Sequence, residues 1–583
     1  MKRSLEKLES SHFDLVIIGG GITGACLAHD AVLRGLSVAL IEKNDFGAAT
    51  SSASSKLLHG GIRYLQQGRF NKVRESALER VYFQTIAPHL TRYIPFIVPT
   101  HKAIKKSKLL MTAGMMAYQA TCLGQDRYIS DVGKRVPRWR YVSKPEIAEL
   151  IPGYAPIDLT GGVLFYESHM HSSERMTLAF LETAANGGAV IANYVQAQAF
   201  IKNKQKVVGL QATDTLTGKA LEIRGKVVVN AAGPWIPGFN EKSDQKASRG
   251  LVTGYSKGAH IITKPLTKGH AIALATQKQN QSIINRGGRH VFIIPWRGHS
   301  LIGTTYGAYE GNLDEVAPDE NDIAELVADI NAAIGNDVLS RSDVRHSYAG
   351  LYPLIDDDID PKVYQGTGNY QVVDHLQKEG IDGLVTVFGA KFTTARLLAE
   401  RALNMIVTKF DQSFDVCKTQ ETPLSMAKIE QLKNYKQAKI KAYQHQFSEE
   451  TVDHLITNYG TAVDKISSLA TQNPAWAEPL LSDELSDGLN DGLSHLKTIQ
   501  AEVIYAVREE MACHLDDVVF RRTGLGTLGH PGVAALTRCA DLMALELGWN
   551  EQAREAQLTR TLSRFFAVGA GISQSELGKV ENA

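Results

Sequence analysis

The sequence predicts an α/β protein with a parallel-sheet domain near its N-terminus, a region of antiparallel strands and a helical C-terminal domain. Three observations support this fold class. Within residues 13–45, an apolar run, a turn with three glycines and a helical pattern follow one another. Residues 203–233 alternate apolar and polar side chains between turn sequences, which is typical of antiparallel strands. After about residue 411 the pattern is mostly helical.

The first strand, turn and helix form a dinucleotide-binding pattern. Gly19, Gly21 and Gly24 have G-x-G-x-x-G spacing, and the strand after the helix ends in Glu42. The glycines allow a tight turn, a close approach of the pyrophosphate and close packing of helix on strand. The helix N-terminus offers N–H groups to phosphate. An acid at position 42 favours an unphosphorylated ribose. We therefore expect a Rossmann-type nucleotide domain.

Composition limits the other classes of function. The chain has 583 residues, a formal net charge of +1 and five scattered cysteines. This charge gives no general attraction to nucleic acid, and the cysteines fit a reduced cytoplasmic protein without a disulfide framework or zinc site. The N-terminal "MKRSLEKLESSHFD" lacks the apolar region of a secretory signal. No run reaches the roughly 18 apolar residues of a membrane-spanning helix.

Residues 101–124 allow two interpretations. The basic "HKAIKKSK" precedes the apolar "KLLMTAGMMAYQATCLG". This segment is either a helix packed on the protein or an interfacial helix that lies on a membrane. The sequence favours the first interpretation.

A serine-rich stretch follows the second strand of the nucleotide domain. "ATSSASSKLLHGGIRYL" (49–65) resembles the signature of the FAD-dependent glycerol-3-phosphate dehydrogenases, a family of the D-amino-acid-oxidase-like flavoenzyme superfamily. Further segments follow in the order of that family. They are "VVVNAAGPW" (227–235), "KGAHIIT" (257–263), "FIIPWRGHSLIGTT" (292–305), "VFGAKFTTARLLAERA" (387–402) and "VREEMACHLDDVVFRRT" (507–523).

The resemblance implies FAD as the cofactor. Hydroxyl and backbone N–H groups of the serine stretch suit a pyrophosphate and the edge of a flavin ring, and its glycines let the backbone lie close to the ring. The residues that the resemblance and the glycine turn assign to the cofactor are Gly19, Gly21, Gly24, Glu42, Thr50, Ser51, Ser52, Ser54, Ser55, Lys56, His59, Gly60, Gly61, Val195, Ala232, Gly233, Trp235, Gly389, Lys391 and Thr393.

We expect three units along the chain. An FAD-binding and substrate domain covers 1–410, a linker covers 411–428, and a helical domain covers 429–583. The substrate-covering parts are expected at about 76–150, where the pattern is helical and basic, and at 250–350, where more strands are expected. Residues 388–407 predict a turn that opens a long amphipathic helix. The charges of "DDVVFRRT" (516–523) are interpreted as ion pairs between helices, with a regulatory or oligomeric role as the alternative.

The resemblance also implies an active site. Oxidation of a secondary alcohol by a flavin needs a base for the hydroxyl proton and a positive group for orientation. His260 is expected to be the base. Arg63, with Tyr64 beside it, and Lys391 are expected to bind the substrate. His169 and His171 offer two metal ligands on one strand face, but no third ligand is evident, so we expect no metal.

Three positions depart from the family pattern. Tyr352 stands where an arginine usually precedes a proline, Gly368 lies near the position of a second arginine, and Tyr306 replaces an acid. A phosphate dianion prefers bidentate, charge-assisted donors. Either other cations such as Arg345 or Arg396 bind the phosphate, or the substrate is a different small polyol, hydroxy acid or amine.

We expect sn-glycerol 3-phosphate to be oxidised to dihydroxyacetone phosphate, with quinone as the electron acceptor and oxygen as the alternative. The 101–124 tract would then attach the protein to the inner face of the cytoplasmic membrane. A homodimer is one oligomeric state that the sequence allows. The rival functions are a non-catalytic or tRNA-modifying FAD protein and an NAD-dependent enzyme.

Overall fold

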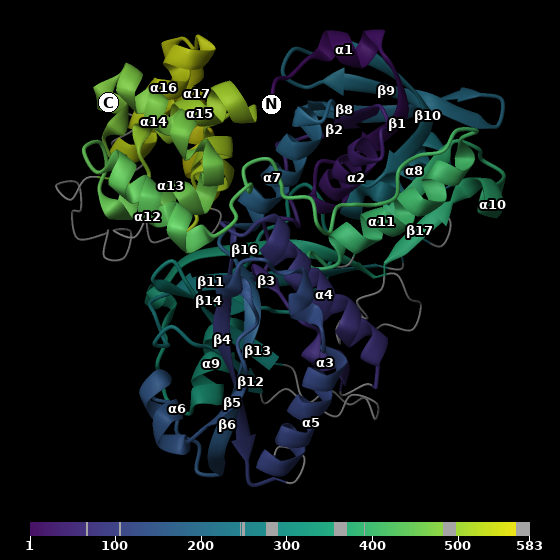
Figure 1. The fold of residues 1–583 in the computed structure, drawn as a ribbon. Helices are drawn as coiled ribbons and strands as arrows, with labels where there is room; N and C mark the ends of the chain where they lie inside the picture. Colours follow the sequence, from purple (N-terminus) through teal and green to yellow (C-terminus); the bar gives the residue numbers. More distant parts are fainter. Residues whose placement is uncertain are drawn as a thin grey trace.

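The computed structural model describes residues 1–65, 68–103, 107–244, 247, 251, 252, 254–275, 290–354, 370–389, 391–481 and 497–566. Of Arg63 it describes the backbone alone. Three parts are visible in Figure 1: a sheet flanked by helices at the top right, a second sheet below it, and a bundle of helices at the top left. The fold class expected from the sequence is confirmed.

The first sheet, sheet A, contains the nucleotide-binding unit. Its strand order is β17-β18-β10-β1-β2-β7, and β8 and β9 extend it from β10. The strands from β18 to β7 run parallel, while β8, β9 and the first part of β10 form the antiparallel meander predicted for 203–233. The strand bounds are β1 His12–Ile18, β2 Val38–Ile41, β7 Val190–Ala192, β8 Val195–Asn203, β9 Lys206–Asp214, β10 Ala220–Asn230, β17 Gln371–Asp374 and β18 Leu384–Phe388.

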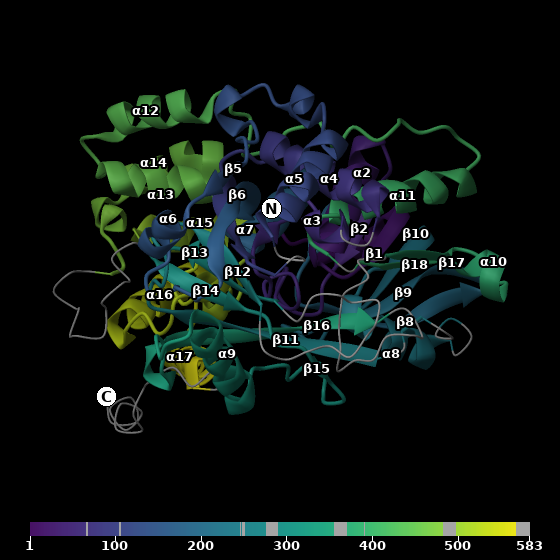
Figure 2. The same ribbon diagram turned by 90° about the horizontal axis from the view of Figure 1, so that it is seen from below.

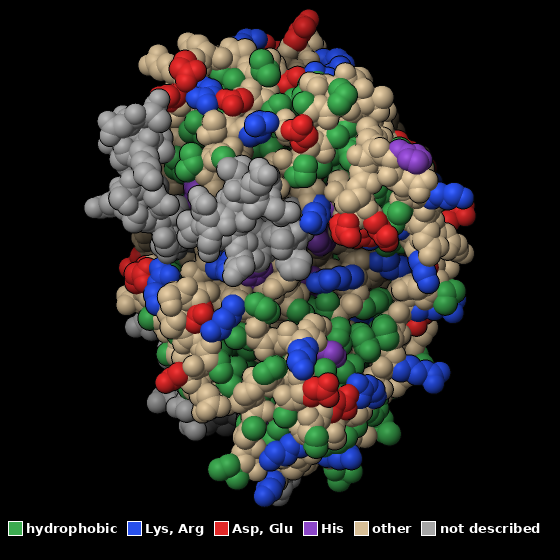
Figure 3. All heavy atoms as spheres, turned by 90° about the vertical axis from the view of Figure 1, so that its left-hand side faces the viewer, with side chains coloured by type: hydrophobic (Ala, Val, Ile, Leu, Met, Phe, Trp, Pro, Cys, Tyr) green, Lys and Arg blue, Asp and Glu red, His purple; other side chains and the backbone are tan. Residues whose placement is uncertain are grey.

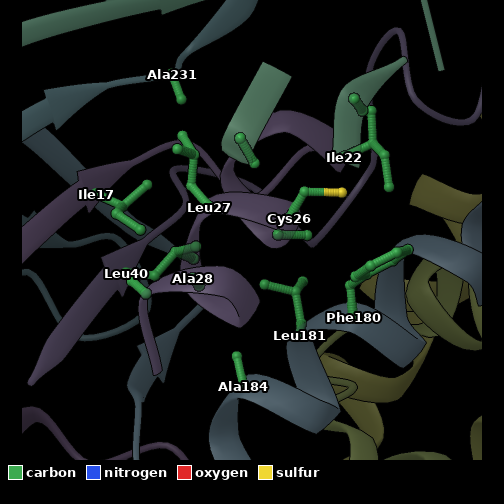
Figure 4. Close-up of a cluster of buried hydrophobic side chains, with 14 of the residues drawn as sticks. Ile17, Ile22, Cys26, Leu27, Ala28, Leu40, Phe180, Leu181, Ala184 and Ala231 are labelled. Carbon is green, nitrogen blue, oxygen red and sulfur yellow. The ribbon is translucent and has the colours of Figure 1, made fainter. Parts of the chain in front are cut away.

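Helices cover sheet A and build the largest core. Helix α2 (Ile22–Leu33) lies between the sheet and helices α7 (Ser173–Asn186) and α11 (Ala395–Ile406). Apolar side chains of α2, such as Cys26 and Leu27, meet Ile17 of β1 and Phe180 of α7 in this core (Figure 4). The remaining helices of this part are α1 Leu5–Ser10, α8 Ile236–Ser243 and α10 His375–Glu379. Burial of α2 on both sides fixes the position of the glycine turn before it.

The second sheet, sheet B, is mostly antiparallel and stands below sheet A. Its strand order is β15-β11-β14-β13-β12-β4-β6-β3, with β16 beside β11 and β5 beside β6. Helix α9 (Glu320–Ile334) packs on β11 and β12 (Figure 2). The strand bounds are β3 Leu57–Leu58, β4 Thr91–His101, β5 Arg140–Val142, β6 Leu159–Met170, β11 Gly254–Thr263, β12 Ala271–Ala275, β13 His290–Trp296, β14 His299–Gly303, β15 Gly307–Ala308 and β16 Val344–Leu354.

The expected helical character of 76–150 is only partly correct. Helices α4 (Phe70–Ile86), α5 (Lys108–Thr121) and α6 (Lys144–Leu150) are present, together with the short α3 (Ile62–Leu65), but β4 is a long strand within this range. Pro95 and Pro99 argue against a central strand because proline lacks an N–H donor. Strand β4 accommodates them because it pairs along its length with β6, while β12 pairs with it only near Phe96 and Ile97.

The C-terminal part is helical, as predicted. Residues 411–428 form neither helix nor strand, and they run along the FAD-binding part, where the N–H of Leu424 donates to the carbonyl of Ile86. The helices are α12 Leu432–Tyr443, α13 Glu449–Tyr459, α14 Val463–Gln472, α15 Gln500–Glu510, α16 Val533–Leu547 and α17 Glu551–Phe566, with a π-helical turn at Asp517–Arg522. They enclose two apolar clusters of their own.

Candidate active site

The glycine turn has the geometry that a dinucleotide requires. Gly19 has a positive φ of 107°, and a Cβ at Gly24 would lie 1.9 Å from the Gly19 carbonyl oxygen. At Gly21, by contrast, a Cβ would meet only the Ser51 hydroxyl, at 3.1 Å, among the described atoms. Gly24 therefore allows α2 to pack, while Gly21 leaves open backbone for a phosphate.

Glu42 closes the turn from the end of β2. Its carboxylate accepts hydrogen bonds from the N–H of Gly20 at 2.7 Å and of Asn44 at 2.9 Å. Burial raises the pKa of Glu42, and the two N–H donors counteract this rise. Val195 lies beside it, because the Val195 N–H donates to the Glu42 carbonyl. The acid expected to bind the ribose thus lies directly against the glycine turn.

The serine stretch connects the two sheets. The Ser51 hydroxyl accepts the N–H of Ile22 in the first turn of α2, at 2.9 Å. The Thr50 hydroxyl donates to the Leu351 carbonyl at 2.9 Å, on strand β16. Ser52, Ser54 and Ser55 follow in the same loop, half-buried. These residues lie between the glycine turn and sheet B, where a flavin must lie if its pyrophosphate sits on α2.

The side chain of Lys56 is bound inside the protein. Its ammonium lies 2.8 Å from the Glu174 carboxylate in the first turn of α7, and both side chains are almost fully buried. Burial lowers the pKa of Lys56, although Glu174 opposes this shift. The Lys56 ammonium therefore anchors the serine stretch to α7. Any contact of Lys56 with the cofactor is expected to come from its backbone atoms.

The His-Gly-Gly turn is held by a buried ion pair that the sequence did not reveal. The N–H of Gly60 donates to the Glu167 carboxylate at 2.6 Å, and Arg80 lies 3.1 Å from the same carboxylate. Gly61 has a positive φ of 73°. The N–H of His59 donates to the Thr393 hydroxyl at 3.3 Å. This last bond joins the turn to the segment before α11.

Two of the expected substrate-binding residues lie together. The Lys391 ammonium is 4.0 Å from the centre of the Tyr64 ring. Gly389 precedes Lys391, and a Cβ at Gly389 would lie 2.9 Å from the Thr23 hydroxyl, so the loop between β18 and α11 reaches the start of α2. Arg63 belongs to α3 next to Tyr64. A cation over the face of an aromatic ring is stabilised by that ring.

His260 forms a second pair with Tyr348. The two residues are directly opposite in strands β11 and β16, and their rings stack with centroids 5.1 Å apart. His260 is 5 % exposed, and its Nδ1 atom has no hydrogen-bond partner in the described part of the chain. Burial, and secondly the charge of Lys56, lowers the pKa of His260 to about 3. The imidazole is therefore neutral and can accept a proton.

The face that carries His260 also carries Tyr352. Ser256 of β11 is paired with Tyr352 of β16. Each of them lies four residues from its counterpart in the pair of His260 and Tyr348. Because side chains alternate between the two faces of a strand, all four point to the same face. Gly350 lies between the two tyrosines, and its Cβ would be 2.8 Å from the Cβ of Ala53 in the serine stretch. Tyr352 thus lies on the cofactor side of sheet B. Tyr306 follows β14 and is half-buried, and Gly368 lies outside the described residues.

Of the two cations considered as substitutes for the missing arginines, Arg396 is engaged inside the protein. It is buried with Glu79, whose carboxylate lies 2.9 Å from its Nε, and it also donates to Glu400 and Thr419 at 2.8 Å. These contacts argue against a phosphate contact of Arg396. Arg345 is half-buried near the start of β16, where the pairing with β11 shifts register, and its phosphate contact stays a prediction.

The remaining predicted residues lie near the end of β10. Ala232 and Gly233 follow this strand, and a Cβ at Gly233, where φ is 55°, would meet nothing within 4 Å among the described atoms. The Lys43 ammonium lies 4.0 Å from the centre of the Trp235 ring. Strand β10 is separated from β2 by β1, and the contact of Lys43 with Trp235 brings the ends of β2 and β10 together.

His169 is buried at the end of β6, and His171, just after this strand, is half-buried. Burial lowers the pKa of each well below the usual range. Within the described ranges, no group of three His, Cys, Asp or Glu side chains has the arrangement of a metal site.

Several residues of the site carry no sequence signal of their own. Tyr348 is one tyrosine among many, and its role follows from the register that places it opposite His260. Glu167 and Arg80 come from β6 and α4, far apart in sequence. A strand register and a pairing between distant elements could not be read from the spacing of residues.

The donor set fits FAD. The open backbone at Gly21 and Gly233 matches a pyrophosphate and a ribose, and Glu42 matches ribose hydroxyls. The serine stretch and the His-Gly-Gly turn then line the path from α2 to sheet B.

Comparisons with known proteins agree with this geometry. Residues 14–403 match the family described as FAD dependent oxidoreductase, and residues 417–554 match the C-terminal domain of alpha-glycerophosphate oxidase. The chain is 30 % identical to a glycerol-3-phosphate dehydrogenase of Synechocystis sp. over 96 % of this chain and 97 % of the relative. It is 31 % identical to a mitochondrial glycerol-3-phosphate dehydrogenase of Mesocricetus auratus, covering 97 % of this chain and 75 % of the relative.

Solved structures show the same fold. The crystal structure of the glycerol-3-phosphate dehydrogenase from Bacillus halodurans, complexed with FAD, has a TM-score of 0.72 at 25 % identity and covers 98 % of both chains. The L-alpha-glycerophosphate oxidase of Mycoplasma pneumoniae shares the fold over 71 % of this chain and 99 % of its own, with a TM-score of 0.51 at 14 % identity.

The fold and the glycine turn, together with these matches, define a flavin-dependent oxidoreductase. More closely, the chain belongs to the FAD-dependent glycerol-3-phosphate dehydrogenase family, and its cofactor is FAD. Among the helices that the structure describes, none is both long and apolar enough to cross a bilayer.

Proposed function

We propose that the protein oxidises sn-glycerol 3-phosphate to dihydroxyacetone phosphate and passes the electrons to a quinone. The single observation that carries this proposal is that the serine stretch contacts β16, the strand paired with that of His260, while His59, which follows it, bonds Thr393, two residues after Lys391. The names of the relatives that match along almost the whole chain support the substrate.

The proposed reaction removes a hydride from the alcohol carbon and a proton from its oxygen. FAD supplies the acceptor for the hydride. His260 takes the proton, because its neutral imidazole is held in one orientation by the Tyr348 ring. Proton and hydride together account for both hydrogens lost as the alcohol becomes a ketone.

Lys391 and Arg63 are proposed to hold the substrate anion. The Lys391 ammonium lies 4.0 Å from the centre of the Tyr64 ring, and Arg63 precedes Tyr64 in α3. A lysine just before a helix has no favourable interaction with the helix dipole, so the helix itself gives no reason for a cation at this position. A phosphate or a developing alkoxide is an anion that such a cation stabilises.

A second candidate is a different small polyol, hydroxy acid or amine as the substrate of the same flavin site. The position of Tyr352 favours it, because this side chain stands on the cofactor side of β16 where the family usually has an arginine. A tyrosine can donate one hydrogen bond but cannot bind a phosphate dianion in bidentate form.

Anaerobic mixing of the yellow holoenzyme with sn-glycerol 3-phosphate distinguishes the two candidates. Prompt loss of flavin colour at millimolar concentration or below supports glycerol 3-phosphate. Colour that persists in protein that dithionite still reduces contradicts it and supports a rebuilt substrate pocket. Glycerol and glycerate, which lack the phosphate, serve as comparison substrates.

Peripheral attachment to a membrane is proposed from helix α5. One face of α5 packs on the protein through Met115 and Tyr118. The other leaves an apolar surface, the α5 patch, consisting of Leu109, Leu110, Met116 and Leu123. The interpretation of this tract as simply packed on the protein therefore holds for one face only. In Figure 1, α5 lies at the lower right, and Figure 3 shows the left-hand face, where hydrophobic side chains mix with basic and acidic ones at the lower end.

Vesicle flotation tests this attachment. The double variant Leu109→Gln/Leu110→Gln should lose binding to vesicles that contain anionic lipid, because about half of the exposed apolar patch is removed. Leu545→Gln on α16 is the matched control, since Leu545 is 81 % exposed and Leu109 is 82 % exposed. Equal binding of both variants would contradict a role of α5. Reduction of a water-soluble quinone by the substrate-reduced protein tests the acceptor separately.

A further inference from the structure

A buried ion cluster joins the C-terminal helical domain to the loop after β2. Asp45 of this loop is 1 % exposed. Arg521 and Arg522, from the π-helical turn, both contact its carboxylate. Arg522 binds it in bidentate form, with Nη1 2.5 Å from Oδ2 and Nη2 2.8 Å from Oδ1. Bidentate guanidinium–carboxylate pairs are among the strongest polar contacts in proteins.

The loop that carries Asp45 presses on the dinucleotide turn. The N–H of Gly47 donates to the Gly20 carbonyl at 3.1 Å. The Phe46 ring covers Gly20 so closely that a Cβ there would lie 2.7 Å from the ring carbon Cδ1. The N–H of Gly20 donates in turn to Glu42. A shift of residues 45–47 must therefore change the position of the turn and of the proposed ribose ligand.

Two further residues tie the same loop to the C-terminal domain. The Asn193 amide donates to Asp45 at 3.1 Å and to the Met511 carbonyl at 2.9 Å. The N–H of Tyr194 donates to the Asn44 carbonyl, while its hydroxyl donates to Asp517 at 2.6 Å. The C-terminal domain thus reaches the loop by three routes, all of which end at residues 44–45.

The charges favour a rigid cluster. Burial alone would raise the pKa of Asp45, but the charges of Arg522 and Arg521 outweigh burial and lower this pKa. Asp45 is therefore ionised. Removal of its charge would leave two guanidinium groups buried without their main partner, which is costly.

We propose that Arg521 and Arg522 are positioning residues for FAD, which hold Asp45 and thereby fix residues 45–47 against the dinucleotide turn. The C-terminal domain then influences FAD affinity through its contacts with Asp45. This role gives the charges of "DDVVFRRT" (516–523) a function beyond pairing between helices.

A second buried ion pair between the domains serves as a control. It distinguishes a specific effect of Asp45 on FAD binding from a general weakening of the domain interface. Arg175 of α7 lies 2.7 Å from Glu510 of α15, and both side chains are buried. The Arg175 guanidinium donates hydrogen bonds to the Glu510 carboxylate and to the Asn458 carbonyl. These contacts do not involve residues 42–51. The Glu510 carbonyl also accepts a hydrogen bond from Arg522 at 2.9 Å, but Glu510→Gln changes only the carboxylate. This variant therefore weakens the same domain interface and keeps the backbone carbonyl that Arg522 contacts.

The test uses the apo forms of three full-length proteins: the wild type, Asp45→Asn and Glu510→Gln. Each is titrated with FAD and followed by flavin fluorescence. The thermal midpoint of each apo protein is measured in parallel. Loss of a charge-assisted contact predicts that Asp45→Asn raises the Kd for FAD roughly tenfold or more. Glu510→Gln should change this Kd by less than about threefold, even if it lowers the thermal midpoint by as much as Asp45→Asn does.

Arg522→Lys supplies a variant that keeps the charge but loses the bidentate geometry. It should raise the Kd in the same direction as Asp45→Asn, and it covers the case in which Asp45→Asn fails to fold. Equal rises of Kd in Arg522→Lys and Glu510→Gln would overturn the proposal, because FAD affinity would then follow the interface as a whole. An unchanged Kd in folded Asp45→Asn would also overturn it.

Discussion

The imidazole of His260 stacks on the phenol ring of Tyr348 with an interplanar angle of 17° and a centroid distance of 5.1 Å. The Tyr348 hydroxyl also donates to the Ser54 carbonyl at 2.7 Å. One tyrosine therefore joins the proposed base in sheet B to the serine stretch of the cofactor half.

The two functions of Tyr348 can be separated by substitution. Tyr348→Phe keeps the ring and removes the bond to Ser54, so we expect kcat to fall by less than about tenfold. Tyr348→Leu also removes the stacking surface and frees the imidazole, and kcat should fall further, by roughly another tenfold. Steady-state kinetics with an artificial electron acceptor measure both. Identical kcat values for the two variants would show that the ring does not orient His260.

His260→Gln should lower kcat by about 10²- to 10⁴-fold, the usual contribution of a general base. Burial lowers the pKa of His260 to about 3, so the basic, neutral form persists as the pH falls. The kcat/KM of the wild type should therefore show no loss from this residue between pH 8 and 5. A loss centred near pH 6.5 that disappears in His260→Gln would contradict this assignment of the neutral form.

Lys391→Gln tests the anion contact. Loss of a charge-assisted donor is expected to cost about 1.5–3 kcal/mol, which corresponds to an increase of roughly tenfold or more in the KM for a phosphorylated substrate. The KM for an unphosphorylated polyol should change less. Lys409→Gln is the control, because the Lys409 ammonium lies 2.7 Å from Asp374, beyond the far end of α11. Similar KM changes for both substrates would assign Lys391 to the flavin instead.

Much of the cofactor half was predictable from the sequence because local rules govern it. The glycine spacing and the acid at Glu42 act within one βαβ unit, and the structure shows both in the expected places. The substrate half depends on register between β11 and β16 and on contacts such as Gly60 with Glu167, which join residues distant in sequence. Arg396 shows the limit most clearly. It was considered as a substitute phosphate ligand, but its buried partner Glu79 comes from α4, far away in the sequence.

Gly60→Ala should disrupt the His-Gly-Gly turn, which is proposed to contact FAD. A Cβ at Gly60 would lie 2.0 Å from the Tyr118 hydroxyl oxygen and 2.8 Å from Arg80 Nη1, so the turn or both side chains must move. Overpacking of this kind costs about 1–3 kcal/mol. The purified variant should contain less FAD per chain and have a lower Tm. Gly114→Ala on α5 meets nothing described within 4 Å and should be neutral or slightly stabilising. Full FAD content in Gly60→Ala would mean that the turn tolerates the shift.

The buried histidines predict that acid destabilises the protein well above the pH at which carboxylates titrate. Burial lowers the pKa of four of them to about 3 or 4, namely His29, His89, His260 and His346. In the unfolded chain a histidine takes up a proton near pH 6.5. Between pH 6.5 and about 4, the unfolded state thus binds more protons than the native state, so the free energy of unfolding decreases as the pH falls.

One histidine can be removed to measure its share of this slope. Each buried neutral histidine contributes up to about 1.4 kcal/mol per pH unit in this window. His29 packs against Phe180 with ring centroids 5.4 Å apart, and neither of its ring nitrogens has a described partner. His29→Leu should therefore fold and should flatten the decline of Tm between pH 6.5 and 4. His445→Leu, at an exposed position of the loop after α12, is the control. If both variants keep the wild-type slope, His29 is protonated in the native state and the burial argument fails for it.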